Sequence, residues 1–159
     1  MWAQEEERFL LRAIELSSQG MQTGHGGPFG CVIVKNGEII GEGYNRVITE
    51  NDPTAHAEIV AIREACRGLK HFQLDECEVY TSCEPCPMCL GAIYWARPKR
   101  VIFANTRFDA AAIEFDDDFI YNQLNTDLAD RKIQFIHHPH PLALKVFDDW
   151  KKMGEKGIY

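Results

Sequence analysis

The apolar positions in the first part of the chain predict a helix followed by a hairpin. One set recurs at the spacing of a single helix face: Phe9, Leu10, Ala13, Ile14 and Met21. Two apolar runs, at residues 31–34 and 39–40, then flank Asn36-Gly37. Asn-Gly between apolar runs predicts a tight hairpin, because both central residues of the turn must adopt positive φ.

The rest of the chain alternates between helix and strand patterns. Helices are predicted from about residue 55 to 67, from about 85 to 96 and over 142–152, with Pro85 suiting a helix start. Strands are predicted at residues 78–81, 100–104 and 133–136. This alternation predicts an α/β protein: a three-layer α/β/α sandwich around a central five-stranded mixed sheet whose later strands are parallel.

Length and charge restrict the class of protein. The 159 residues contain no repeat or linker and predict a single domain over residues 1–159. The net charge of −7 argues against tight, non-specific binding of nucleic acid, which requires a basic face, but leaves a local basic groove open. No apolar run approaches the roughly 20 residues that cross a bilayer, and the N-terminus is acidic where a signal peptide would be basic. We therefore expect a cytoplasmic protein with no membrane contact.

Six cysteines need an explanation in a reducing compartment, where structural disulfides are rare. Cys31, Cys66 and Cys77 are scattered through apolar surroundings and are expected to be small buried residues. Cys83, Cys86 and Cys89 instead fall at every third position. That spacing indicates a metal site or a redox pair.

Two short segments bring metal-binding side chains to predicted helix starts, at residues 54–58 and 83–89. Imidazole and thiolate together form a ligand set that zinc prefers. Cys86 and Cys89 share one face of a helix turn, and a helix N-terminus favours the thiolate form. His56 would supply the third ligand. Three protein ligands leave one tetrahedral position open, which is the arrangement of a catalytic zinc ion.

Glu58 follows two residues after His56 and could carry protons beside the metal without binding it. A lone His-x-Glu is usually a solvated helix turn, and the cysteines alone could begin an iron–sulfur or four-cysteine zinc site. No cysteine follows Cys89, which weakens both of those. A redox pair at Cys83 or Cys86 would leave His-x-Glu unexplained. Together the two segments match the His-x-Glu…Pro-Cys-x-x-Cys signature of zinc deaminases.

The chain resembles the cytidine-deaminase-like superfamily and, within it, the bacterial guanine deaminases, over almost its whole length. Four stretches carry this resemblance: residues 26–30, 51–58, 80–98 and 115–121. The first three are shared in looser form with tRNA adenosine deaminases. The last stretch, with its Phe-Asp-Asp sequence, and the tyrosine-ended tail favour the guanine enzymes.

The resemblance implies one zinc ion per subunit, held by His56, Cys86 and Cys89, with Glu58 as the proton shuttle and Cys83 buried nearby. It implies a purine base as substrate, with these surrounding residues: Phe29, Asn45, Trp95 and the catalytic Asp117. It also implies that the C-terminal segment, ending in Tyr159, closes over the active site of the other subunit in a domain-swapped homodimer.

Each of these contacts has a plainer interpretation. Phe29 and Trp95 could be core residues, and Asn45 could be a turn residue. The three aspartates at 116–118 could begin a solvated helix, and Asp116 is an alternative to Asp117 as the carboxylate facing the base. Three histidines in a proline-broken stretch are expected on a surface loop rather than in catalysis: His137, His138 and His140.

The expected reaction is hydrolysis of guanine to xanthine and ammonia. One alternative is deamination of adenosine in tRNA, which would use positive charge such as the cluster Arg97, Lys99 and Arg100. Guanosine, cytosine or an aminotriazine are alternative small substrates, because the metal motifs are common to their deaminases. A non-catalytic zinc or redox module is the alternative from another class.

Overall fold

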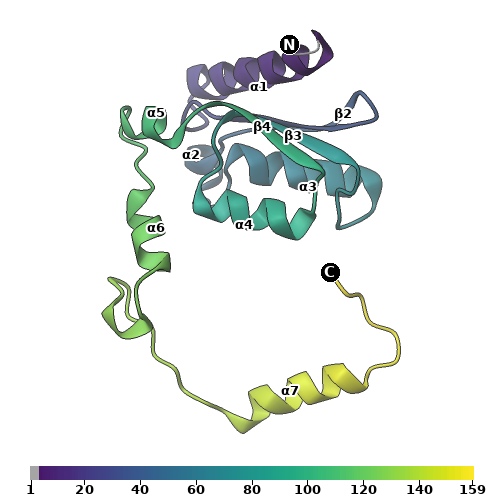
Figure 1. Cartoon of the computed structure of the whole chain (residues 1–159), viewed down its shortest axis with the longest axis vertical. Coiled ribbons are helices and arrows are strands. Elements are labelled where there is room, and N and C mark those ends of the chain that lie inside the picture. The colour runs from purple at the N-terminus through teal and green to yellow at the C-terminus, as the bar shows by residue number, and fades with distance from the viewer. Residues whose placement is uncertain (1–3) are drawn as a thin grey trace. The chain divides into compact units, whose positions relative to one another are not determined.

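A mixed sheet with strand order β2-β1-β3-β4 forms the centre of the chain up to Asp117 (Figure 1). The computed structural model describes residues 4–159. The elements up to Asp117 are α1 (Gln4–Gln22), β1 (Gly30–Lys35), β2 (Glu38–Tyr44), α2 (Val47–Glu50), α3 (Ala57–Leu69), β3 (Cys77–Cys83), α4 (Pro87–Ala96), β4 (Arg100–Asn105) and α5 (Arg107–Ala111). None of the described helices is both long and apolar enough to cross a membrane.

A second compact unit spans Asp118–Tyr159. It holds α6 (Asp118–Leu124), a 3-10 turn (Leu128–Asp130) and α7 (Pro141–Lys152). The closing helix predicted at residues 142–152 is therefore confirmed. The prediction that residues 1–159 form one domain stays a prediction.

The hairpin and the strand directions agree with the sequence predictions. β1 and β2 pair antiparallel, and Asn36 (φ 52°) and Gly37 (φ 79°) both adopt the positive φ that a two-residue turn requires. β1 also pairs antiparallel with β3, whereas β3 and β4 are parallel. The helix between β3 and β4 is α4, so the second half of the sheet is built as a β-α-β unit.

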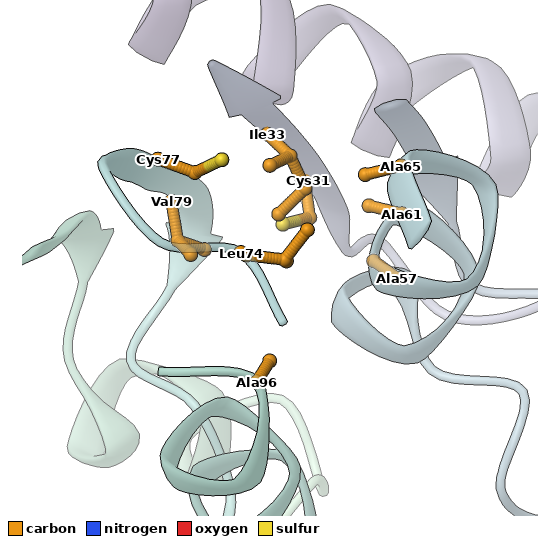
Figure 2. Close-up of a cluster of buried hydrophobic side chains, with 9 residues drawn as sticks. All are labelled: Cys31, Ile33, Ala57, Ala61, Ala65, Leu74, Cys77, Val79 and Ala96. Carbon is orange, nitrogen blue, oxygen red and sulfur yellow. The ribbon is translucent and has the colours of Figure 1, made fainter. Parts of the chain in front are cut away.

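Helices cover both faces of the sheet, which gives the three predicted layers (Figure 1). Alternate residues of β1 point to opposite faces. On one face Val32 and Val34 pack with Phe9 and Leu16 of α1. On the other face nine buried residues form a cluster with α3 and α4 (Figure 2): Cys31, Ile33, Ala57, Ala61, Ala65, Leu74, Cys77, Val79 and Ala96.

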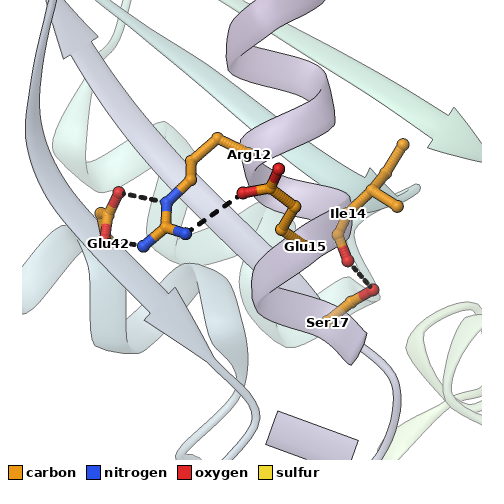
Figure 3. Close-up of polar contacts among 5 residues, drawn as sticks. All are labelled: Arg12, Ile14, Glu15, Ser17 and Glu42. Atoms are coloured by element: carbon orange, nitrogen blue, oxygen red, sulfur yellow. Dashed lines mark hydrogen bonds and ion pairs between the residues drawn. The ribbon is translucent and has the colours of Figure 1, made fainter. Parts of the chain in front are cut away.

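Arg12 joins α1 to the outer strand β2 (Figure 3). Its Nε and Nη2 atoms donate hydrogen bonds of 2.8 Å to the two carboxylate oxygens of Glu42, and Nη1 lies 3.3 Å from Glu15. This paired hydrogen bond lowers the pKa of Glu42 below its ordinary value. On the same helix, Ser17 Oγ donates a 2.7 Å bond to the Ile14 carbonyl. The ion pair adds a polar link between α1 and β2 to the apolar packing of the helix on the sheet.

The predicted fifth strand at residues 133–136 is wrong, because the sheet of the described residues has four strands. Ile133 and Ile136 are each 76% exposed, and residues 131–140 form neither helix nor strand. A short apolar run becomes a strand only where its backbone finds a neighbouring strand to pair with. Within the described residues this segment has no such neighbour.

Candidate metal centre

Two predicted ligands are the residues that immediately precede helices. His56 is the N-cap of α3 and Cys86 is the N-cap of α4, both with extended backbone. Their carbonyls accept the first helical bonds, from Val60 N at 3.0 Å and Leu90 N at 2.8 Å. Neither side chain caps its own helix, so both can face a metal. Cys89 lies in the first turn of α4.

The three donor atoms are spaced as zinc requires. His56 Nδ1 lies 3.5 Å from both Cys86 Sγ and Cys89 Sγ, and all three atoms lie within 4.8 Å of one another. Ligands at about 2.3 Å (sulfur) and 2.0–2.1 Å (nitrogen) from a tetrahedral zinc ion lie roughly 3.5 Å apart. The donor set and its spacing therefore fit zinc. Among the described residues it is the one histidine, cysteine or carboxylate group of this kind.

The three donor groups shift one another's pKa values through hydrogen bonds. Hydrogen bonds from Cys89 and His56 lower the pKa of the Cys86 thiol to about 4. The bond to Cys86, together with burial, raises the pKa of Cys89. The same sulfur raises the pKa of His56. A bound divalent cation would stabilise both thiolates at once.

Glu58 is a buried carboxylate directly beside these ligands. It is 6% exposed, and its Oε2 accepts a 3.4 Å hydrogen bond from Cys89 Sγ. Thr81 Oγ1, from β3, lies 3.5 Å from the other oxygen. Burial raises the pKa of Glu58 above its ordinary value. A carboxyl group whose pKa moves toward neutrality is suited to taking up and releasing protons.

The other cysteines lie outside this group. Cys83 is buried, its Sγ donates to the Thr106 carbonyl at 3.6 Å, and burial raises the pKa of its thiol to about 11. A redox cysteine requires a lowered pKa, so Cys83 is not suited to that role. Cys31 and Cys77 are buried as expected, whereas Cys66 is half-buried. The histidines His137, His138 and His140 are exposed.

Asn45 and Phe29 lie in neighbouring loops next to the ligands. Asn45 N donates to the Phe29 carbonyl at 3.0 Å, and the following residue, Arg46, donates to the Ala55 carbonyl at 2.9 Å, one residue before His56. Asn45 is buried, and its Oδ1 accepts from Val47 N at 3.1 Å. The turn interpretation of Asn45 is thus correct for its oxygen, which leaves the Nδ2 group as a donor.

Asp117, at the end of the first unit, interacts with one of the ligands. Asp117 is half-buried, and burial together with the charge on Cys86 raises the pKa of its carboxyl group. Asp116 is exposed. Just before it, Phe115 meets the Phe29 ring edge-on at 5.0 Å, a contact that the sequence did not single out. The sequence signal that could have pointed to Phe115 is its position immediately before three aspartates.

Trp95 and Tyr159, both predicted to contact the base, lie in different units of the chain. Trp95 is 63% exposed on α4, so it is not a core residue of this chain. Tyr159 belongs to the second unit, and its expected contact with the base stays a prediction.

Residues 3–105 match the family profile described as the cytidine and deoxycytidylate deaminase zinc-binding region. The chain therefore belongs to this family of zinc-binding deaminases.

Within the family, the chain is similar to the guanine deaminase of Bacillus subtilis (strain 168). The two are 54% identical over 153 residues, which cover 96% of this chain and 98% of that protein. The X-ray structure of Bacillus subtilis guanine deaminase superposes with a TM-score of 0.94 over the same shares of the chains. A tRNA-specific adenosine deaminase of Aquifex aeolicus (strain VF5) is 33% identical over 96% of this chain and 98% of its own.

Substituting one cysteine at a time tests the ligand assignment. We expect the purified protein to hold one zinc ion per chain, and Cys86→Ala to lose most of it because two ligands remain. The matched control is Cys83→Ala, three residues earlier and outside the donor group, which should keep its zinc. Elemental analysis of both proteins, with circular dichroism to verify folding, decides the matter. Equal zinc loss in the two variants would contradict the assignment.

Proposed function

We propose that this chain is a guanine deaminase, which hydrolyses guanine to xanthine and ammonia. The observation that carries the proposal is a His-Cys-Cys donor set with a buried carboxylate beside it. It occurs in a chain that is 54% identical to a guanine deaminase over nearly the full length of both proteins.

His56, Cys86 and Cys89 would hold the zinc ion. When bound, zinc lowers the pKa of water to about 7 and stabilises negative charge that develops during attack on the base. The thiolate ligands require reduced cysteines, and all six cysteines are free. This fits a cytoplasmic location, which we propose for the protein.

Glu58 would move the protons of the reaction. A water oxygen adds to C2 of guanine, and Glu58 transfers one water proton to ring nitrogen N3, where xanthine keeps it. The second proton passes to the amino group, the C2–N bond breaks, and ammonia leaves. The burial of Glu58 supports this role, because a carboxyl with a raised pKa can both accept and donate at each step.

Two polar side chains, Asp117 and Asn45, would form hydrogen bonds with the base. Guanine presents N–H donors at N1 and at its 2-amino group, and a carboxylate complements them. Asp117 is half-buried and close enough to Cys86 to feel its charge, whereas Asp116 is exposed, which favours Asp117. Asn45 would donate from Nδ2 to an acceptor on the base, since its oxygen is engaged by Val47. The aromatic faces of Phe29 and Trp95 would flank the ring.

The surface charges favour a free base over tRNA. Arg100 is paired with Glu6 at 2.6 Å and with Glu78 at 2.9 Å, and Lys99 lies 3.8 Å from Glu76. These acids offset most of the basic cluster that would otherwise attract phosphates. The net charge of −7 acts in the same direction.

We also propose a domain-swapped homodimer. The second unit buries no residue of its helices, and the apolar residues of α7 are exposed: Leu142, Leu144, Val146, Phe147 and Trp150. The first unit likewise exposes apolar side chains on α4 and on the edge strand β4: Leu90, Tyr94, Trp95 and Phe103. Groups of exposed apolar side chains are typical of surfaces that another chain or segment covers. Exchange of the C-terminal segment between two copies would cover both.

Glu58→Gln tests the proton shuttle. We expect the variant to keep its zinc and to lose about 10²–10⁴-fold in kcat, since the amide cannot carry protons. The control is Glu64→Gln, an exposed carboxylate on the same helix, which should behave like the parent. Ammonia release and chromatography of products from guanine, guanosine, adenine, cytosine and tRNA provide the measurement. Zinc without ammonia from any of them would favour a non-catalytic module, and activity on another base alone would refute guanine as substrate.

Substituting Asp117 and its neighbour Asp116 in turn tests which carboxylate contacts the base. Asp117→Asn should lower kcat/KM for guanine about tenfold or more, because a charged hydrogen-bond partner of the base is lost. Asp116→Asn, a change on the surface, should stay within about twofold of the parent enzyme. Steady-state kinetics on both variants decide between the two carboxylates, and the reverse order of effects would assign the role to Asp116.

Mixing two inactive chains tests the exchange of the C-terminal segment. One chain carries Glu58→Gln, and the other lacks residues 156–159. In a swapped dimer the intact tail of the first chain completes the active site of the second, so co-refolding should restore activity that neither chain has alone. Light scattering should give twice the 18.2 kDa of one chain. A dimer without restored activity would mean that each tail serves its own chain.

A further inference from the structure

Two adjacent glycines in the loop between α1 and β1 occupy positions where their backbone does not require glycine. Among the described glycines, Gly24 and Gly37 alone adopt left-handed φ. Gly26 and Gly27 have ordinary φ, which any residue can adopt. Their lack of a side chain must therefore matter for the space around them.

At Gly26, that space is filled by Asn45. A Cβ on Gly26 would overlap Asn45 Oδ1 and would lie 2.8 Å from the Asn45 carbonyl oxygen and 2.9 Å from its Cγ. Asn45 cannot easily move aside. It is 5% exposed, its Oδ1 accepts from Val47 N, and its own N–H is bonded to the Phe29 carbonyl.

At Gly27, the neighbours are the two aromatic rings. A Cβ there would lie 2.8 Å from Phe115 Cζ and 2.9 Å from Phe29 Cε2. These rings meet edge-on at 5.0 Å with an interplanar angle of 88°. Phe115 is two residues from Asp117, so the ring contact also holds the acidic segment beside the loop.

Other glycines of the chain show what a purely structural position looks like. A Cβ on Gly30 would overlap the Ala13 carbonyl oxygen and lie 2.5 Å from Ser17 N, both in the backbone of α1. A methyl group there would push a helix off the sheet and cost stability. At Gly27 the added methyl instead meets only the side chains of Phe29 and Phe115. At Gly26 it meets the Asn45 side chain first and, at 2.8 Å, the Asn45 carbonyl oxygen, but no backbone atom of a helix.

We propose that Gly26 and Gly27 are positioning residues for substrate recognition: they set the Asn45 amide and the Phe29–Phe115 pair in place against the base. The inference rests on the proposed function, in which Asn45 and Phe29 contact the base. It assigns substrate affinity to a part of the chain that carries no reactive group.

A double-mutant cycle on the zinc-loaded, full-length enzyme tests this coupling. Gly26→Ala should raise KM for guanine about tenfold, the effect of losing one hydrogen bond to the base, with a smaller change in kcat. Asn45→Ala should do the same. The double variant should be no worse than Asn45→Ala, because the methyl group acts through an amide that is already gone. Gly68→Ala, where a Cβ meets nothing within 4 Å, should match the parent.

Stability and structure provide readouts that do not depend on turnover. Gly26→Ala should keep its zinc and remain folded, and its unfolding midpoint should fall less than that of Gly30→Ala, whose methyl group meets the backbone of α1. A crystal structure of Gly26→Ala should show Asn45 Oδ1 separated from Val47 N. Additive effects of Gly26→Ala and Asn45→Ala, an unmoved Asn45, or instability like that of Gly30→Ala would each overturn the proposal. If the parent enzyme acts on another base, the guanine assignment fails, and the same cycle measured on that base decides the role of the glycines.

Discussion

The metal site depends on one structural constraint: the N-terminal ends of α3 and α4 lie next to each other. His56 and Cys86 are the N-caps of α3 and α4, so the fold brings an imidazole and two sulfurs together with the positive ends of two helix dipoles. Those dipoles favour thiolates, and a cation between the sulfurs completes the charge balance. Glu58 lies in the first turn of α3, buried against the Cys89 sulfur, and this places a proton carrier beside the metal site.

Close packing of small residues brings α3 against β2. A Cβ on Gly41 would lie 2.6 Å from the Ala61 carbonyl oxygen, and one on Gly43 would lie 2.7 Å from Ala61 N. β2 and α3 thus touch backbone to backbone. Asn45 follows directly after β2, so the same contact that places His56 also sets the distance between the metal ligands and the residue proposed to read the base.

Local features of the sequence predicted most of the fold and the metal centre. Asn36-Gly37 determines its own turn, and Cys86 and Cys89 are brought together by one helix turn. Features that depend on residues far away in the sequence could not be predicted from local patterns. The run at 133–136 has strand-like residues but no strand to pair with, and Phe115 gains its role from Phe29, more than eighty positions earlier in the chain. Burial, which sequence spacing does not reveal, distinguishes Asp117 from Asp116.

X-ray absorption at the zinc edge of the purified protein tests the central claim most directly. The account predicts two sulfur scatterers at about 2.3 Å and one imidazole nitrogen at about 2.0–2.1 Å, with a further light atom in the open position. Three or more sulfurs would place Cys83 in the first coordination sphere and turn the centre into a closed structural site. That result, or a spectrum without zinc, would contradict a catalytic metal beside Glu58.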